Sequence, residues 1–236
     1  MNRQKLKNTL KRFGQLLFQL CISFVLLSLI VVILYRHVNP PITGMMVYKK
    51  AGMGDEPIQY QWEDLDGINK NVPIAFMAAE DQHFLEHFGF DLEAIKQASI
   101  RNTDKSGPIR GGSTISQQVA KNLFLFPTKS LLRKGVEAYF TLLIELIWPK
   151  CRIIEMYVNI VELAPGIYGT EAAAQHFFRK PANELTQAEA ALMATVLPNP
   201  STFDLAHPSA YMLKRRKWIS KQIFNLGGEE VFKACY

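Results

Sequence analysis

The stretch AAEDQHFLEHFGFD, Ala78–Asp91, places two adjacent acids, Glu80 and Asp81, at the end of an apolar segment. The preceding residues have helical periodicity, so we expect a helix from about Pro73 that continues until Gly89 stops it. Two alanines just before Glu80 would let another element approach closely. A carboxylate in such apolar surroundings has a raised pKa, which suits a general base. A solvated surface pair of acids is the alternative interpretation of this segment.

The same stretch contains HFLEH, residues 83–87, which matches the H-x-x-E-H pattern of inverted zinc peptidases. On a helix, two histidines four residues apart share one face. Zinc needs a further ligand, and the later chain offers His176 and His207 but no distinctive second motif. We therefore expect packing or surface roles for these histidines and no zinc site.

Helical patterns continue along most of the chain beyond Val72, and we expect one mainly α domain over 72–236. Helix N-terminal signals are Asp91 and two capping-box pairs, Thr114 with Gln117 and Thr186 with Glu189. The expected helices after the first cover residues 92–102, 115–126, 130–148, 151–162, 187–197 and 209–224. Gly and Pro mark residues 102–112 as a loop. Residues 36–71 are expected to form a linker and lead-in, with short strands at 45–49 and 58–62.

The N-terminal part of the chain has the features of a membrane anchor. Residues 13–35 contain no charge over 23 positions, and as a helix they would span roughly 35 Å, enough to cross a bilayer core of about 30 Å. No small-residue cleavage site follows, so we expect an uncleaved anchor. Residues 1–12 are basic without an acid, whereas only Arg36 and His37 follow before Lys49. The positive-inside rule then places the N-terminus in the cytoplasm and the domain outside.

Composition restricts the class of partner. The chain of 236 residues has a formal charge of +6 and a pI near 9.2, but it carries no nucleic-acid-binding motif. A membrane surface or a phosphate-bearing lipid substrate suits this charge, and a merely basic solvated surface is the alternative. Cys21 lies in the anchor, while Cys151 and Cys235 are far apart in sequence and form no disulfide framework. A bridge between the last two remains open on the oxidising side of a membrane.

The stretch GGSTISQQVAKNLFL, Gly111–Leu125, is unusually rich in hydroxyl and amide groups. Glycine-rich loops that enter helices present free N–H groups to anions. The side chains that would form a sugar- or phosphate-reading surface are Ser113, Thr114, Gln117, Gln118, Lys121 and Asn122. An ordinary capped amphipathic helix with a polar outer face is the alternative.

A second charged motif lies at Arg133, Lys134 and Glu137. Arg133 and Glu137 are four residues apart, so an exposed helical ion pair is one interpretation. The other is a cationic cluster with one acid that could hold a divalent metal next to phosphates.

Taken in order, these blocks resemble glycosyltransferase family 51, the biosynthetic peptidoglycan glycosyltransferases related to the glycosyltransferase domain of class A penicillin-binding proteins. The pattern E-D-x-x-F-x-x-H-x-G-x-D falls on Glu80, Asp81, Phe84, His87, Gly89 and Asp91. The blocks G-G-S-T-[IL]-[ST]-Q-Q-x-x-K-N, R-K-x-x-E and R-I-[IL]-E-x-Y-x-N fall on 111–122, 133–137 and 152–159. The later GIYGTEAAAQHFF also resembles a family block, although Pro165 stands where an Arg is common. The similarity covers Val72 to about Pro200, and His83 and Glu86 occupy variable positions of the first pattern.

The resemblance implies a lysozyme-like α fold and a polymerase that uses lipid II. The acceptor GlcNAc 4-hydroxyl would attack the donor MurNAc anomeric carbon with inversion, forming a β-1,4 bond and releasing undecaprenyl pyrophosphate. Glu80 would take the hydroxyl proton. Glu137, directly or through Mg²⁺ or another divalent cation, would stabilise the leaving pyrophosphate together with Lys121, Arg133 and Lys134. No organic cofactor is expected.

The resemblance is to the monofunctional, membrane-anchored form, because the chain has neither S-x-x-K nor K-T-G of a penicillin-binding domain. It implies a single-pass protein of the bacterial inner membrane with a periplasmic catalytic domain. The expected partners are lipid II, nascent glycan, the membrane and proteins of cell-wall synthesis or division. Two other classes remain open: a lytic, lysozyme-like wall hydrolase and a non-catalytic, membrane-tethered wall-binding protein.

Overall fold

The computed structural model describes residues 3–52, 57–103, 112–128 and 130–235. It is mainly helical, as the sequence predicts. The chain divides into two compact units, Met1–Val38 and Asn39–Tyr236. Gly111, predicted to be part of the polar stretch, and most of the predicted loop 102–112 lie outside the described residues.

The first unit is built on one helix, α1 (Arg3–His37). Its segment Leu10–His37 is long and apolar enough to cross a membrane, and few of its side chains are buried. Apolar side chains that are mostly exposed suit a lipid environment. This segment contains residues 13–35, which the sequence predicts as the anchor.

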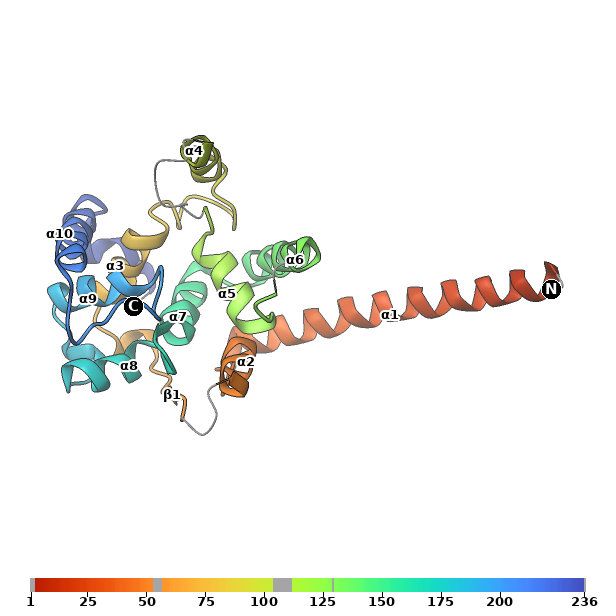
Figure 1. Ribbon diagram of the computed structural model, residues 1–236, viewed down its shortest axis with the longest axis horizontal. Helices are drawn as coiled ribbons and strands as arrows, with labels where there is room; N and C mark the ends of the chain where they lie inside the picture. Colours follow the sequence, from red (N-terminus) through yellow and green to blue (C-terminus); the bar gives the residue numbers. More distant parts are fainter. Residues whose placement is uncertain (1–2, 53–56, 104–111, 129, 236) are drawn as a thin grey trace. The chain divides into compact units, whose positions relative to one another are not determined.

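The second unit contains the remaining helices, labelled in Figure 1. They are α2 (Gly44–Gly52), α3 (Asn71–Glu80), α4 (Leu92–Thr103), α5 (Ile115–Phe124), α6 (Leu131–Ile147), α7 (Lys150–Ile160), α8 (Thr170–Ala173), α9 (Gln187–Met193) and α10 (Ala210–Asn225). The predicted helices from α4 onward, including both capping boxes and the Asp91 cap, are confirmed within a few residues at their ends.

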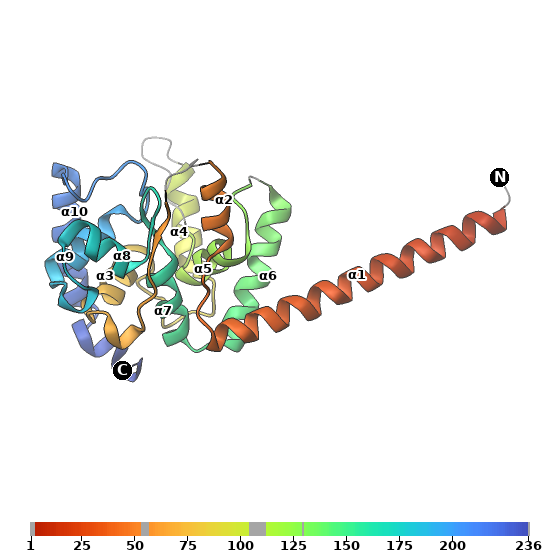
Figure 2. The ribbon, with the colours of Figure 1, turned by 90° about the horizontal axis from the view of Figure 1, so that it is seen from below.

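Two helices form the centre of this unit. Helix α5 packs against α2, α6 and α7, whereas α3 packs against α7, α9 and α10; Figures 1 and 2 show α7 between the two groups. Helix α3 is buried on nearly all sides, from Val72 to Ala78. A helix that is apolar all round belongs in a protein core, so the acid at its end, Glu80, is fixed by the core of the domain.

A small sheet lies beside the helices. Strand β3 (Ile167–Tyr168) pairs in parallel with β1 (Gln59–Tyr60) and antiparallel with β2 (Glu162–Ala164). The predicted strand at 58–62 is therefore confirmed, while β2 and β3 are too short to give a sequence signal.

The predicted strand at 45–49 is wrong, because these residues lie in α2. The Thr43 hydroxyl oxygen accepts the Met46 N–H at the start of this helix, and Met46 is completely buried. A Cβ on Gly44 would approach the Leu123 carbonyl oxygen to 3.1 Å. Tertiary packing against the end of α5 thus overrides the β-propensity of this segment.

Residues upstream of α3 contribute to the core of the second unit. Leu65 and Ile68 are buried, as is Met46, and the Asn159 side chain exchanges hydrogen bonds with the Glu63 backbone N–H and C=O. The compact unit begins at Asn39, upstream of the domain boundary predicted at residue 72.

A disulfide joins Cys151, near the start of α7, to Cys235 in the C-terminal 3₁₀ segment Gly228–Cys235. Phe232 of that segment is buried, and the segment packs against α3 and α7. The bridge that the sequence left open is present, and it ties the end of the described chain to α7, while packing holds the same segment against α3.

Candidate active site

The predicted base, Glu80, is the last residue of α3. The helix does not continue to Gly89 as predicted, because Asp81 leaves the helical conformation with φ −157° and ψ 79°. The expectation about the alanines is confirmed, since Arg215 of α10 approaches closely enough to donate to the Ala79 carbonyl oxygen at 3.4 Å. Glu80 is therefore held at the junction of a core helix with α10.

Glu80 is half-buried, and burial raises the pKa of its carboxyl above the ordinary value. A hydrogen bond from Gln118 and the cations Arg215 and Lys121 oppose that rise, whereas Asp81 adds to it. The Gln118 amide nitrogen donates to Glu80 Oε2 at 2.9 Å. A partly desolvated carboxylate of this kind is suited to accept a proton.

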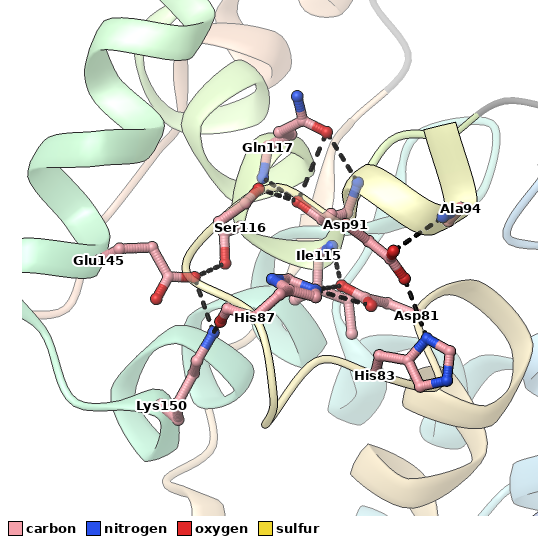
Figure 3. A network of polar contacts seen from close by, with 12 residues as sticks. Asp81, His83, His87, Asp91, Ala94, Ile115, Ser116, Gln117, Glu145 and Lys150 are labelled. Atoms are coloured by element: carbon pink, nitrogen blue, oxygen red, sulfur yellow. Dashed lines mark hydrogen bonds and ion pairs between the residues drawn. The ribbon is translucent and has the colours of Figure 1, made fainter. Parts of the chain in front are cut away.

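The Asp81 carboxylate accepts hydrogen bonds from other residues of the protein (Figure 3). This buried carboxylate accepts the Ile115 N–H at 2.9 Å, and it accepts the His87 Nε2–H at 2.9 and 3.0 Å. It thereby joins the end of α3 to the start of α5. With these partners Asp81 has a structural role, and Glu80 is the member of the acid pair that is available for chemistry.

The two histidines of the zinc motif have separate carboxylate partners. His83 Nδ1–H donates to Asp91 Oδ2 at 3.0 Å, while His87 pairs with Asp81. The segment after Glu80 consists of turns, so the two histidines do not share a helix face. In the part of the chain that the structure describes, no cluster of His, Cys, Asp and Glu could hold a metal ion.

Gly89 allows the turns to close onto α5 and α6. Its φ is +80°, and a Cβ there would lie 2.8 Å from Thr141 Cγ2. The Gly89 carbonyl oxygen accepts the Thr114 hydroxyl at 2.7 Å. Asp91 then caps α4 by accepting the Ala94 N–H at 2.8 Å.

The predicted polar surface at the start of α5 separates into two groups. Thr114 and Gln117 are buried in the capping box, where the Gln117 side chain accepts the Thr114 N–H at 2.9 Å. Asn122 is also buried. Ser113 is exposed, and Gln118 and Lys121 are half-buried. Two members, Gln118 and Lys121, thus act on Glu80, while Thr114 and Gln117 hold the helix terminus in place.

Beneath this surface lies a polar network that no sequence pattern predicts. Glu145 of α6 accepts a hydrogen bond from the Ser116 hydroxyl and another from Lys150 Nζ at 2.8 Å, as Figure 3 shows. Lys150 also donates to the His87 carbonyl oxygen at 2.7 Å. Buried charges are tolerated when they are paired in this way. No local motif marks this pair: Glu145 and Lys150 are five residues apart across the junction of α6 and α7, and their other partners, Ser116 and the His87 carbonyl, are distant in sequence.

The second predicted acid, Glu137, is only 6% exposed. It accepts a hydrogen bond from Arg133 Nη1 at 2.6 Å, so the predicted i, i+4 pair is present and largely buried, whereas Lys134 is exposed. Burial lowers the pKa of Lys121; Glu137 and Glu80 raise it and Arg133 lowers it. The charge of Lys121 therefore interacts electrostatically with both predicted acids, Glu137 and Glu80.

A cleft of about 390 Å³ opens beside Glu80. It is lined by Ala78, Ala79, Glu80, Asp81, Gln82, His83, Asp91, Ala94, Gln97, Gly112, Ser113, Thr114 and Trp218. No sequence motif marks Trp218 or Arg215. Both belong to the basic last helix and become part of the site only when α10 packs on α3. Glu80 is the carboxyl of this lining whose pKa is raised, and a concave site that holds such a group is a usual setting for catalysis.

Comparison with known proteins places this geometry in a family. Residues 48–224 match the family model described as Transglycosylase. A biosynthetic peptidoglycan transglycosylase of Pseudomonas syringae pv. syringae (strain B728a) is 51% identical over 207 residues, 86% of this chain and 87% of the relative. One of Xanthomonas campestris pv. campestris (strain B100) is 49% identical over 216 residues, 89% and 87% of the two chains. The family-model match extends across the acids, the polar helix and the cleft described above, and the chain belongs to the transglycosylase family.

Proposed function

We propose that this transglycosylase polymerises peptidoglycan glycan strands from lipid II, with Glu80 as the general base. The observation that carries the proposal is the position of Glu80: a half-buried carboxyl of raised pKa in the wall of a cleft. The family and the names of its relatives supply the class of reaction.

In the proposed step, the 4-hydroxyl oxygen of the acceptor GlcNAc forms a bond to the anomeric carbon of the donor MurNAc. The bond from that carbon to the phosphate oxygen breaks, and its electron pair leaves with undecaprenyl pyrophosphate. The hydroxyl proton passes to Glu80. A single displacement of this kind inverts the α-linked donor into a β-1,4 product.

The leaving pyrophosphate is assigned to the cationic groups near Glu137. Lys121 and Arg133 lie on facing helices, α5 and α6, which pack together, and Lys134 adds an exposed cation. Preorganised charges aimed at developing negative charge are often the largest catalytic contribution. Glu137 holds the Arg133 guanidinium in place and keeps the cluster from being purely cationic.

A divalent cation fits this assignment only if the substrate brings further ligands. Glu137 is the acid of the cluster, and it is paired with Arg133. Mg²⁺ commonly binds one or two carboxylates together with substrate phosphates. Glu137 would hold such an ion, which would neutralise charge on the pyrophosphate.

The roles proposed for α5 follow from its two groups of polar side chains. Ser113 and Thr114 line the cleft and are assigned to the sugar. Gln118 and Lys121 are assigned to the reacting groups, because both act on Glu80. Gln117 and Asn122, buried in the helix, support this surface from within.

The membrane is the proposed location of the reaction. Besides α1, helix α6 presents apolar side chains to solvent: Leu131 is 91% and Leu132 79% exposed, and Leu142 and Leu146 are also exposed. Leucines next to Arg133 and Lys134 suit contact with a lipid surface. We place α1 across the bacterial inner membrane with its N-terminus in the cytoplasm, the domain in the periplasm, and other cell-wall synthesis or division proteins as further partners.

Glu80→Gln tests the assignment of the base. With the full chain in detergent and labelled lipid II, we expect polymerisation to fall by about 10²–10⁴, the range for loss of a general base. Binding of lipid II is expected to persist, because the amide keeps the shape of the side chain. Glu86→Gln makes the same change at an exposed position outside the cleft and serves as the matched control.

Polymerisation at the wild-type rate by Glu80→Gln would remove Glu80 from the mechanism. The same assay run with preformed glycan separates the other classes of function. Fragmentation of glycan would indicate a lytic enzyme, and an absence of both reactions in the wild type would indicate a binding protein.

A further inference from the structure

Three side chains from three helices form a chain of hydrogen bonds that ends at Glu80. The hydroxyl of Tyr157, in α7, donates to Gln118 Oε1 at 3.2 Å. Gln118, in α5, donates through Nε2 to Glu80 Oε2 at 2.9 Å. Tyr157 is 0% exposed, and its ring packs edge-on against Phe76 at a centroid distance of 6.1 Å, so its hydroxyl is held in place by the core.

The direction of this chain is determined by the chemistry of its members. A glutamine amide has an acceptor end and a donor end. Its donor end faces Glu80 only if its oxygen faces Tyr157. With the amide reversed, an amide oxygen would face the oxygens of the ionised carboxylate, which accept hydrogen bonds but cannot donate them. The Tyr157 hydroxyl favours the productive orientation because it donates to the amide oxygen.

We propose that Tyr157 is a positioning residue for the transfer reaction: it fixes the Gln118 amide, which holds Glu80 Oε2 and leaves Oε1 for the proton of the acceptor hydroxyl. This proposal rests on the assignment of Glu80 as the base. Among the described residues, the hydrogen bond from Gln118 is the one that the Glu80 carboxylate receives. A carboxylate tied through one oxygen keeps the other in a defined direction, as a base within hydrogen-bond reach of its substrate requires.

Electrostatics support the same roles. Burial, together with Glu80 and Asp81, raises the pKa of Tyr157 well above its usual value, so the hydroxyl remains a donor at every working pH. The charged groups that face Glu80 are Arg215 of α10, Lys121 of α5 and Asp81. The hydrogen bond from Gln118 lowers the pKa of Glu80, whereas burial raises it. Loss of this hydrogen bond should therefore raise the pKa of Glu80 further.

The test is Tyr157→Phe, which keeps the ring and removes the hydroxyl. We expect polymerisation of lipid II by the full chain in detergent to lose roughly tenfold in kcat with KM little changed, which corresponds to about one hydrogen bond. The acidic limb of the pH–rate profile should move to higher pH. Its position does not depend on how much of the sample is folded, so partial unfolding would not imitate it.

Tyr168→Phe is the matched control. Tyr168 is likewise buried and its hydroxyl donates to Glu162 Oε1 at 3.3 Å, in the small sheet rather than at the cleft. We expect this variant to keep the wild-type rate and pH profile. A shift of the same size in both variants would mean that removal of any buried hydroxyl causes the effect, and would overturn the proposal.

A double-variant cycle tests whether Tyr157 acts through Gln118. In a Gln118→Leu background, Tyr157→Phe should cause no further loss, because the amide that it orients is absent. A full additional loss, or a wild-type rate and profile for Tyr157→Phe alone, would overturn the proposal. If Glu80→Gln is inactive while Tyr157→Phe behaves as wild type, the positioning role fails and the base survives. If Glu80→Gln is active, the base assignment itself has failed.

Discussion

At the scale of single residues, Glu80 shows how one side chain of a candidate active site can lower the stability of the folded protein. Burial raises its pKa, which means that the folded protein binds this proton more tightly than the unfolded chain does. The folded state is therefore favoured at low pH, and it loses stability as pH rises through the raised pKa. An acid that is poised to accept a proton is destabilising in its ionised form.

Glu80→Gln should for this reason be more stable than the wild type near neutral pH. We expect a higher Tm at pH 7, with about 2–4 °C for each kcal/mol recovered. The difference should shrink toward zero as pH falls below the ordinary Glu value of 4.5. Thermal melts of the wild type and the variant from pH 4 to pH 8 measure it. A Tm difference that did not change with pH would argue against a raised pKa.

Interactions between residues that are close together in the chain could be predicted from the sequence. Thr114 with Gln117 and Thr186 with Glu189 form capping boxes because each pair satisfies N–H groups within one helical turn. The hydrogen bonds from Tyr157 to Gln118 and on to Glu80 join three helices. No spacing rule encodes contacts of that kind, so the sequence predicted Gln118 as part of a sugar- or phosphate-reading surface and did not single out Tyr157.

At the scale of elements, the segment after α3 shows why a helix prediction failed. The apolar residues Phe84, Leu85 and Phe88 have helical spacing, but Asp81 is held by the Ile115 N–H, a partner 34 positions away. That bond directs the chain out of the helix at Glu80. The turns that follow bring Gly89 against α6, where a Cβ would meet Thr141 at 2.8 Å.

Gly89→Ala should therefore destabilise the domain, by about 1–3 kcal/mol from the strained backbone alone. The matched substitution is Gly135→Ala in α6, where a Cβ meets nothing within 4 Å and helix propensity favours Ala by about 0.5–1 kcal/mol. Denaturant unfolding should thus shift in opposite directions for the two variants. Equal shifts would show that Gly89 is not constrained by its conformation and its contact with Thr141.

At the scale of the whole molecule, the chain combines an apolar helix with a domain that begins before the catalytic motifs. The first unit ends at Val38 and the second begins at Asn39. The motifs predicted a domain from residue 72, because composition marks residues 36–71 as polar and rich in Pro and Gly. Their contribution to the core rests on a few side chains, such as Met46 and Ile68, which no periodic pattern reveals.

Two truncated chains separate these boundaries. A chain starting at Asn39 retains α2, β1 and their buried side chains, so we expect it to fold and to polymerise lipid II in detergent. A chain starting at Val72 lacks Met46, Leu65 and Ile68, and it leaves β3 without its parallel neighbour. Removal of a large buried apolar side chain typically costs about 2–5 kcal/mol, and three such losses approach the whole stability of a domain, about 5–15 kcal/mol.

Circular dichroism and thermal melts of the two truncated chains test the boundary directly. Equal stability would make residues 39–71 a linker after all, and an unfolded chain from Asn39 would make α1 part of the fold. In liposomes that contain lipid II, the chain from Asn39 should polymerise more slowly than the full chain while both are equally active in detergent. The reason is that a polyprenyl substrate stays in the bilayer, so an enzyme held there by α1 meets it at a higher effective concentration.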